Sequence, residues 1–110
     1  MNYTEMLNYI KKNVSSKERL AQLAEEATEL AKAALKYRRT LDDENPTPVS
    51  KDEAFKNLLE EIDDVALCLD IVSLKWRVEF NSLQRERKLK RWVKRIEEKS
   101  QKGDVDNAGR

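Results

Sequence analysis

The residues best suited to chemistry in this sequence are carboxylates, and they stand at helical spacing in two places. Glu25, Glu26 and Glu29 form an EExxE pattern, and Glu61 and Asp64 form an ExxD pattern further along the chain. At about 100° per residue, each set falls on one side of a helix and borders an apolar stripe. Buried carboxylates are costly, and like charges close together add repulsion. A bound divalent cation would relieve both.

Two other interpretations of these acids stay open. A solvated helix face explains EExxE taken alone, because Glu29 has Lys32 three residues further on. For Glu61 and Asp64, the alternative is pairing with arginine or lysine from the last helix, which would make a structural ion-pair network. The residues alone leave the metal site and the ion-pair network about even.

Composition excludes several other kinds of site. The 110 residues include one cysteine, Cys68, and no histidine, which rules out an intramolecular disulfide, a Cys/His zinc site, and catalysis by serine or cysteine with histidine. Any metal must be held by carboxylates, which favour hard cations such as Mg²⁺, Mn²⁺ or Ca²⁺. The absence of a signal peptide or a long apolar run predicts a soluble, cytoplasmic protein that does not enter a membrane.

The elements that must position the acids are helices. Only two glycines and two prolines occur, so an all-α fold is expected, a bundle of about four helices with two long antiparallel helices at its centre. Ser15 with Glu18 and Ser50 with Glu53 are capping boxes that open the long helices. We expect helices over 4–13, 16 to about 40, 51 to the mid-70s, and a last helix ending near Lys99. The two prolines lie in a loop over 42–50, and a bend is expected near Trp76.

The apolar stripes complete this description. The second helix carries Leu20, Leu23, Ala27, Leu30 and Ala34, and the third carries Phe55, Leu58, Ile62, Val65, Leu69 and Val72. The length predicts a single domain over 1–102, with 103–110 as a disordered tail. Its apolar surface exceeds what one small bundle readily covers, so at least a dimer is expected.

The segments LAEEATELAKAALKYRR and NLLEEIDDVALCLDIV together resemble the MazG-type all-α nucleoside triphosphate pyrophosphohydrolases. The likeness covers roughly residues 16 to 72, and its hallmarks are EExxE on one long helix and ExxD on the next. The loop between them is slightly longer than is usual in that family. The resemblance implies a MazG-like homodimer or homotetramer that hydrolyses a nucleoside or deoxynucleoside triphosphate between the α and β phosphates, with Mg²⁺ required.

The resemblance also implies roles for individual residues. Glu26, Glu29, Glu61 and Asp64 would be the metal ligands, and Glu25 would be the catalytic carboxylate that orients or deprotonates the attacking water, or a further ligand. The residues suggest further substrate contacts: Lys32, Lys36, Lys88 and Arg91 for the phosphates, and Phe55 and Trp76, with Phe80 and Trp92 also available, for the base. Solvated lysines and core aromatics are the alternatives for these positions.

Two rival functions belong to other classes. Between Arg77 and Lys102 the chain has ten basic and four acidic residues, a distribution that could contact nucleic acid. This interpretation leaves Glu61 and Asp64 unexplained, so nucleic acid is the less expected partner. The other rival is a non-catalytic helical interaction protein.

Overall fold

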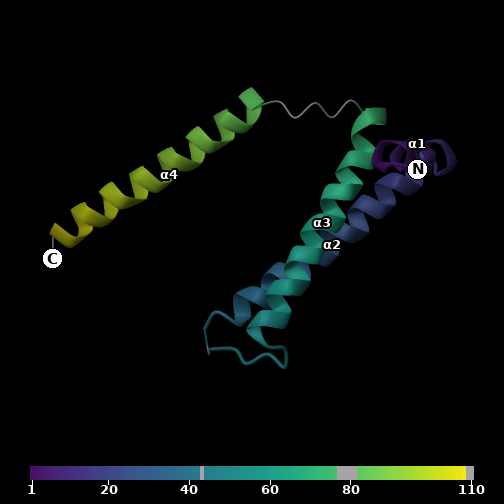
Figure 1. Cartoon of the computed structure of the whole chain (residues 1–110). Coiled ribbons are helices and arrows are strands. Elements are labelled where there is room, and N and C mark those ends of the chain that lie inside the picture. Colours follow the sequence, from purple (N-terminus) through teal and green to yellow (C-terminus); the bar gives the residue numbers. More distant parts are fainter. Residues whose placement is uncertain (43, 77–81, 109–110) are drawn as a thin grey trace. The chain divides into compact units, whose positions relative to one another are not determined.

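The computed structural model describes residues 1–42, 44–76 and 82–108, and within these the chain is helical with no strand. The helices are α1 (Tyr3–Asn13), α2 (Ser16–Arg39), α3 (Lys51–Trp76) and α4 (Ser82–Ala108). The chain divides into two compact units, Met1–Val78 and Glu79–Arg110, so α1, α2 and α3 form one unit and α4 belongs to the other (Figure 1). The all-α class expected from the sequence is confirmed.

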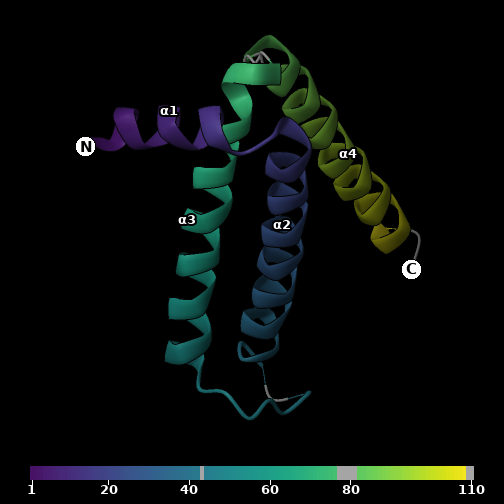
Figure 2. The same cartoon turned by 90° about the vertical axis from the view of Figure 1, so that its right-hand side faces the viewer.

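The first unit is an antiparallel hairpin of α2 and α3 (Figure 2). Its inward-facing residues recur at alternating spacings of four and three, the spacing of a coiled-coil seam. On α2 this inner seam is Arg19, Leu23, Glu26, Leu30, Ala33 and Tyr37, and on α3 it is Ala54, Leu58, Glu61, Val65, Cys68 and Val72. All twelve are buried or half-buried. Contacts between Arg19 and Ile71 and between Tyr37 and Phe55 fix the antiparallel register.

The inner seam of α2 differs from the apolar stripe expected for that helix. Leu23 and Leu30 face inward as predicted, whereas Leu20, Ala27 and Ala34 are exposed. The physical reason is that α2 packs against α3 alone in this unit, and one neighbour covers a narrower arc than the whole stripe. The uncovered part of the stripe remains on the surface.

Helix α1 contacts α3 near the end of the hairpin that lies away from the loop (Figure 2). The hydroxyl of Tyr3 donates to Oδ2 of Asp70 at 2.7 Å. The chain passes directly from α1 to α2, where Oγ of Ser15 accepts from the backbone N–H of Glu18 at 3.2 Å. This bond confirms the predicted start of α2.

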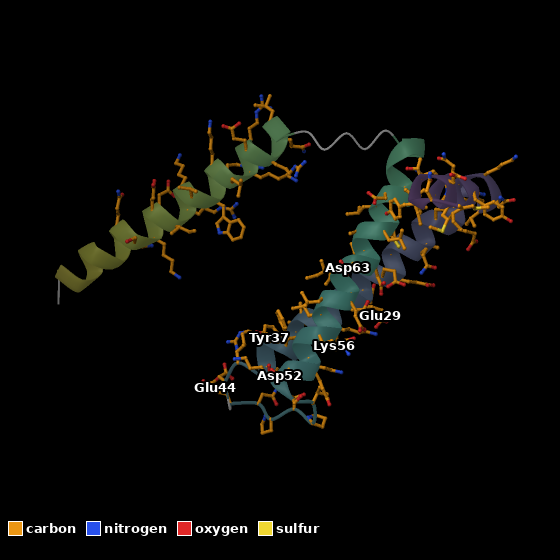
Figure 3. All side chains as sticks on the ribbon, viewed as in Figure 1. Glu29, Tyr37, Glu44, Asp52, Lys56 and Asp63 are labelled. Carbon is orange, nitrogen blue, oxygen red and sulfur yellow. The ribbon has the colours of Figure 1, made fainter. Side chains whose placement is uncertain are left out.

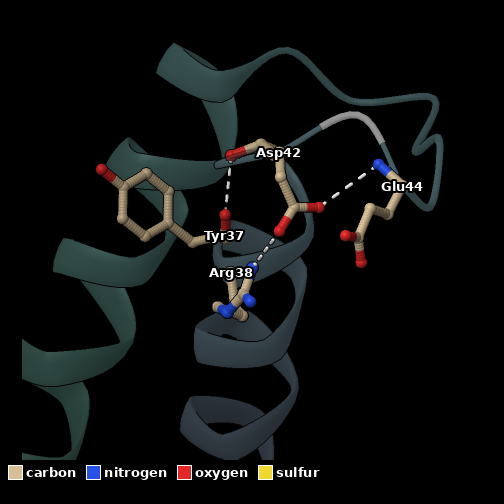
Figure 4. A network of polar contacts seen from close by, with 5 residues as sticks. Tyr37, Arg38, Asp42 and Glu44 are labelled. Atoms are coloured by element: carbon tan, nitrogen blue, oxygen red, sulfur yellow. Dashed lines mark hydrogen bonds and ion pairs between the residues drawn. The ribbon is translucent and has the colours of Figure 1, made fainter. Parts of the chain in front are cut away.

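Side-chain caps hold the loop end of the hairpin. The guanidinium of Arg38 donates to Asp42 at 2.7 Å, the hydroxyl of Thr40 donates to the carbonyl of Tyr37 at 2.7 Å, and the backbone N–H of Glu44 donates to Asp42 (Figure 4). At the start of α3, Oγ of Ser50 accepts from the N–H of Glu53 at 3.2 Å, as the second capping pattern predicts. These bonds satisfy backbone groups at the helix ends.

Helix α4 is the second unit and stands as a single long helix. Leu89, Trp92, Val93 and Ile96 lie on one side of it and are all exposed. The expected end near Lys99 is wrong, because α4 continues to Ala108 through residues assigned to a tail. Gly103 is the one glycine in this stretch; it weakens a helix by about 1 kcal/mol relative to alanine, which is too little to end it. The bend expected near Trp76 falls at 77–81, outside the described residues.

None of the helices in the described ranges is long and apolar enough to span a membrane.

Candidate functional site

Two carboxylates occupy inner-seam positions in the middle of the hairpin, where apolar residues are the rule. Glu26 on α2 faces Glu61 on α3, and Asp64 stands one turn further along α3. Each of the three offers an oxygen, and these oxygens all lie within 4.8 Å of one another. We call these three residues the acidic layer.

The spacing of the acidic layer is close to that of a cation site. Two oxygens on opposite sides of one Mg²⁺ are about 4.2 Å apart, since each Mg–O distance is about 2.1 Å. Neighbouring oxygens on the same ion are about 3.0 Å apart, so the oxygens of the acidic layer, which lie within 4.8 Å of one another, would move closer together to hold one ion.

Glu61 has the least favourable electrostatic environment in the acidic layer. Its Oε2 is buried and has no hydrogen-bond partner. Its pKa is raised above the ordinary value, first by desolvation and then by the negative charges of Asp64, Glu26, Glu29 and Glu60. Oε2 of ionised Glu61 therefore lacks contact with water, and the described residues of this unit offer the carboxylate no positive partner.

Two neighbours extend the acidic layer toward α1. The side-chain amide of Gln22 donates to Oε1 of Glu26 at 2.9 Å. Cys68 is buried one turn beyond Asp64, and its thiol pKa is raised by burial and by the charges of Glu26 and Asp64. A protonated thiol is a weak metal ligand, so Cys68 lines the acidic layer and the carboxylates are the groups that could hold a metal.

The other two predicted acids lie outside the acidic layer. Glu29 is exposed near the middle of the hairpin (Figure 3) and pairs with Lys32 at 3.6 Å. It still faces Glu61 closely enough for its charge to raise the pKa of that carboxyl. Glu25 is exposed, a position open to water. The structure thus brings together three of the five acids, with Glu29 at their edge.

The predicted phosphate-binding cations are spread over both units. Lys32 is exposed and paired with Glu29, while Lys36 is half-buried one turn further along α2. Lys88 and Arg91 are exposed on α4, in the other unit.

The aromatic candidates for the base pocket differ in what surrounds them. Phe55 packs against Tyr37 with ring centroids 5.4 Å apart, toward the loop end of the hairpin, where Figure 3 shows Tyr37 and Asp52. It lies six residues before Glu61, about 9 Å along α3. Trp92 is exposed on α4, and the side chains of Trp76 and Phe80 fall outside the described residues.

Arg19 is a functional candidate that the sequence did not single out. It occupies an inner-seam position two turns before Glu26 and is buried, with 6% of its surface exposed. The signal that could have found it is the spacing of Arg19, Leu23, Glu26 and Leu30, which places an arginine on the inward face of α2.

Comparisons with known proteins leave the site to be interpreted from its own geometry, because no protein-family model, curated protein or solved structure matches the chain.

Proposed function

We propose that this protein is a Mg²⁺-dependent nucleotide pyrophosphohydrolase of the MazG-like kind. It would cleave a nucleoside or deoxynucleoside triphosphate between the α and β phosphates, with water as co-substrate and a monophosphate and pyrophosphate as products. The observation that carries the proposal is Glu61, whose buried Oε2 has no hydrogen-bond partner and lies among other carboxylates.

A cation fits this arrangement better than the other interpretations of the acids do. A solvated face does not account for Glu26 and Glu61, which are half-buried on the inner seam. An ion-pair network needs a cationic partner for Glu61 or Asp64, and the described residues of their own unit provide no ion pair to either. Two seam carboxylates without a cation would separate the helices by repulsion. A divalent ion would join them.

The residues present suit Mg²⁺ chemically. Glu26, Glu61 and Asp64 would hold the ion through carboxylate oxygens, and Glu29 would join if its side chain turned from Lys32. Mg²⁺, when bound, neutralises phosphate oxygens and polarises water. Glu25, exposed on the same helix, would orient the attacking water or accept its proton.

We also propose that the active form is at least a dimer. Phe55, Leu59 and Ile62 recur at i, i+4 and i+7 on α3 and are 46%, 48% and 45% exposed. This outer seam, as we call these three residues, lies on a different side of α3 from the inner seam. Phe55 contacts Tyr37 of α2, but all three side chains remain about half exposed. Burying each such side chain is worth about 1.5–3 kcal/mol, which makes a second copy a stabilising partner.

The test is product analysis. The purified full chain is incubated with a panel of ribo- and deoxyribonucleoside triphosphates and Mg²⁺, and the products are separated. We expect monophosphate and pyrophosphate, and a loss of activity of more than about 100-fold in Glu61→Gln and Asp64→Asn, because even changes to groups that only hydrogen-bond a metal's ligands cost about 10–100-fold. Glu60→Gln, which removes the same charge from an exposed neighbouring position, is the matched control and should retain activity.

Two results would contradict the proposed function. One is release of diphosphate and inorganic phosphate in place of pyrophosphate. The other is no turnover by the wild type, together with salt-dependent binding to DNA or RNA, which would favour the rival role for the basic helix α4.

A further inference from the structure

The guanidinium of Arg19 is buried without a counter-ion. Nη1 donates to the backbone carbonyl of Ile71 at 3.1 Å, whereas Nε is buried and has no partner. Among the described residues of its own unit, no carboxylate lies within ion-pairing distance of this guanidinium. A buried arginine is ordinarily paired with an acid, since its charge is expensive to desolvate. Arg19 therefore lacks the negative group that its position calls for.

Arg19 lines a cavity of about 400 Å³ at the α1 end of the hairpin, which we call the Arg19 cavity. Sites for small molecules usually have about 300–1,000 Å³. Ile10, Val14 and Ile71 give it apolar walls, and apolar surroundings strengthen the attraction between a cation and a bound anion. Glu18 also lines it and contributes a negative charge.

The Arg19 cavity adjoins the acidic layer. Gln22 and Cys68 line the cavity, and Gln22 donates to Glu26 while the thiol of Cys68 responds to the charges of Glu26 and Asp64. Arg19 precedes Glu26 by seven residues, which is about 10 Å along α2. A ligand held at the acidic layer could extend into the cavity past these two shared side chains.

We propose that the Arg19 cavity is an oxyanion site that binds a phosphate group. A guanidinium presents a planar set of N–H donors that matches phosphate oxygens, and a bond between charged groups is stronger than one between neutral groups. If the proposed hydrolysis holds, this site takes a phosphate of the substrate or the released pyrophosphate. Only this identification of the ligand rests on the proposed function. Binding of the oxyanion itself requires no metal.

The experiment measures binding of pyrophosphate to the full chain by calorimetry in the presence of EDTA. We expect the wild type to bind, and Arg19→Met to weaken binding at least about tenfold, since a bond to a charged group contributes about 1.5–3 kcal/mol. Lys17→Met removes the same charge from an exposed position in the same helical turn and should change affinity less than about twofold. Glu18→Gln should tighten binding, because it removes a like charge from the cavity.

Folding of the variant is checked separately. Arg19→Met should melt no lower than the wild type without ligand, because it removes a buried charge that has no acidic partner. If it does not fold, Arg19→Lys decides: weakened pyrophosphate binding supports the site, and unchanged affinity overturns it. Absence of pyrophosphate binding in the wild type, unchanged affinity in Arg19→Met, or equally tight binding of succinate would overturn the assignment to phosphate.

The acidic-layer variants separate this inference from the proposed function. Glu61→Gln and Asp64→Asn should keep or gain affinity for pyrophosphate in EDTA, since they lower the nearby negative charge. Pyrophosphate binding without nucleotide hydrolysis would sink the proposed function and leave the Arg19 site standing. Nucleotide hydrolysis without pyrophosphate binding in EDTA would overturn the Arg19 site and leave the proposed function standing.

Discussion

Glu61 combines features that a carboxylate rarely has together. It lies on the inner seam, and its Oε2 has no hydrogen-bond partner. Its pKa is raised first by desolvation and then by the negative charges of Asp64, Glu26, Glu29 and Glu60. In the absence of a cation, the ionised side chain opposes folding. This one position therefore links the stability of the hairpin to both pH and metal.

The sign of the pH effect follows from the raised pKa. A carboxyl whose pKa is higher in the folded state holds its proton more tightly there, so the free energy of unfolding falls as pH rises from the unfolded pKa through the folded one. In EDTA, Glu61→Gln should be more stable than the wild type at neutral pH, and the difference should shrink on acidification below the ordinary pKa of glutamate. Thermal melts across about pH 4 to 8 measure this difference in stability, because the ordinary pKa of glutamate lies near the lower end of that range.

The same experiment tests the cation. Added Mg²⁺ or Mn²⁺ should raise the melting temperature of the wild type and leave that of Glu61→Gln nearly unchanged, because a ligand that binds only the folded state stabilises it. Glu60→Gln is the control for loss of charge alone. A Glu61→Gln variant less stable than the wild type in EDTA at neutral pH would show that Glu61 has a partner.

At the scale of single residues, the sequence predicted the acids better than the cations. Glu61 and Asp64 lie together because their spacing follows helical geometry, which is local, and the packing of α2 against α3 brings Glu26 to them. Glu29 stands one turn further along α2, where the surface admits Lys32 as a partner. Arg19 was not predicted as a site residue because a basic residue in a highly charged helix is usually solvated. Only the register of α2 against α3 shows that it faces inward.

At the scale of helices, local signals predicted the start points of α2 and α3 well. Ser15 and Ser50 each accept the N–H bond that their capping patterns require. The rotation of α2 about its axis was less predictable, since Leu20 and Leu23 are equally apolar and only packing decides which is covered. The end of α4 was predicted too early because the stretch GDVDNAGR was interpreted as a tail, although no proline follows Lys99 to stop the helix.

Helix α1 depends on a bond that titrates. The hydroxyl of Tyr3 donates to Asp70, and this bond raises the tyrosine pKa. Because the folded pKa is the higher one, the stabilisation is complete below the ordinary pKa of about 10 and is lost as pH rises through the folded value. Tyr3→Phe should remove this dependence.

Hydrogen exchange measures the effect at the right place. Amides of α1 should exchange faster in Tyr3→Phe, by up to about tenfold, because the variant loses one exposed hydrogen bond between α1 and α3. Amides of α2 and α3 near the loop should be unchanged. Tyr9→Phe, an exposed tyrosine on the same helix, is the matched control, and equal effects of both variants would contradict a specific role for the Tyr3–Asp70 bond.

At the scale of the whole molecule, the exposed apolar residues call for a partner. Within its own unit, the outer seam on α3 is about half exposed and the apolar side of α4 is exposed, and a single helix cannot bury its own stripe. The number of copies and their arrangement depend on contacts between chains, which the sequence and structure of one chain do not determine.

Sedimentation velocity tests the assembly. The wild type should sediment as a dimer or larger species, and Ile62→Glu should weaken association at least about tenfold, since it places a charge in an apolar interface. Asn57→Glu, which introduces the same charge at an exposed polar position of α3, should leave the assembly intact. A wild type that stays monomeric at all concentrations would contradict the proposal.

The loop between α2 and α3 has a consequence for how this protein can change over time. The register of the two helices is held by the inner seam and by the contacts of Arg19 and Tyr37, which lie on either side of the acidic layer. Doubling the length of a flexible loop costs only about 0.6 kcal/mol. Insertions and deletions at this hairpin tip are therefore nearly neutral for the site, so descendants of this sequence are free to vary in loop length while the distances among their carboxylates stay fixed.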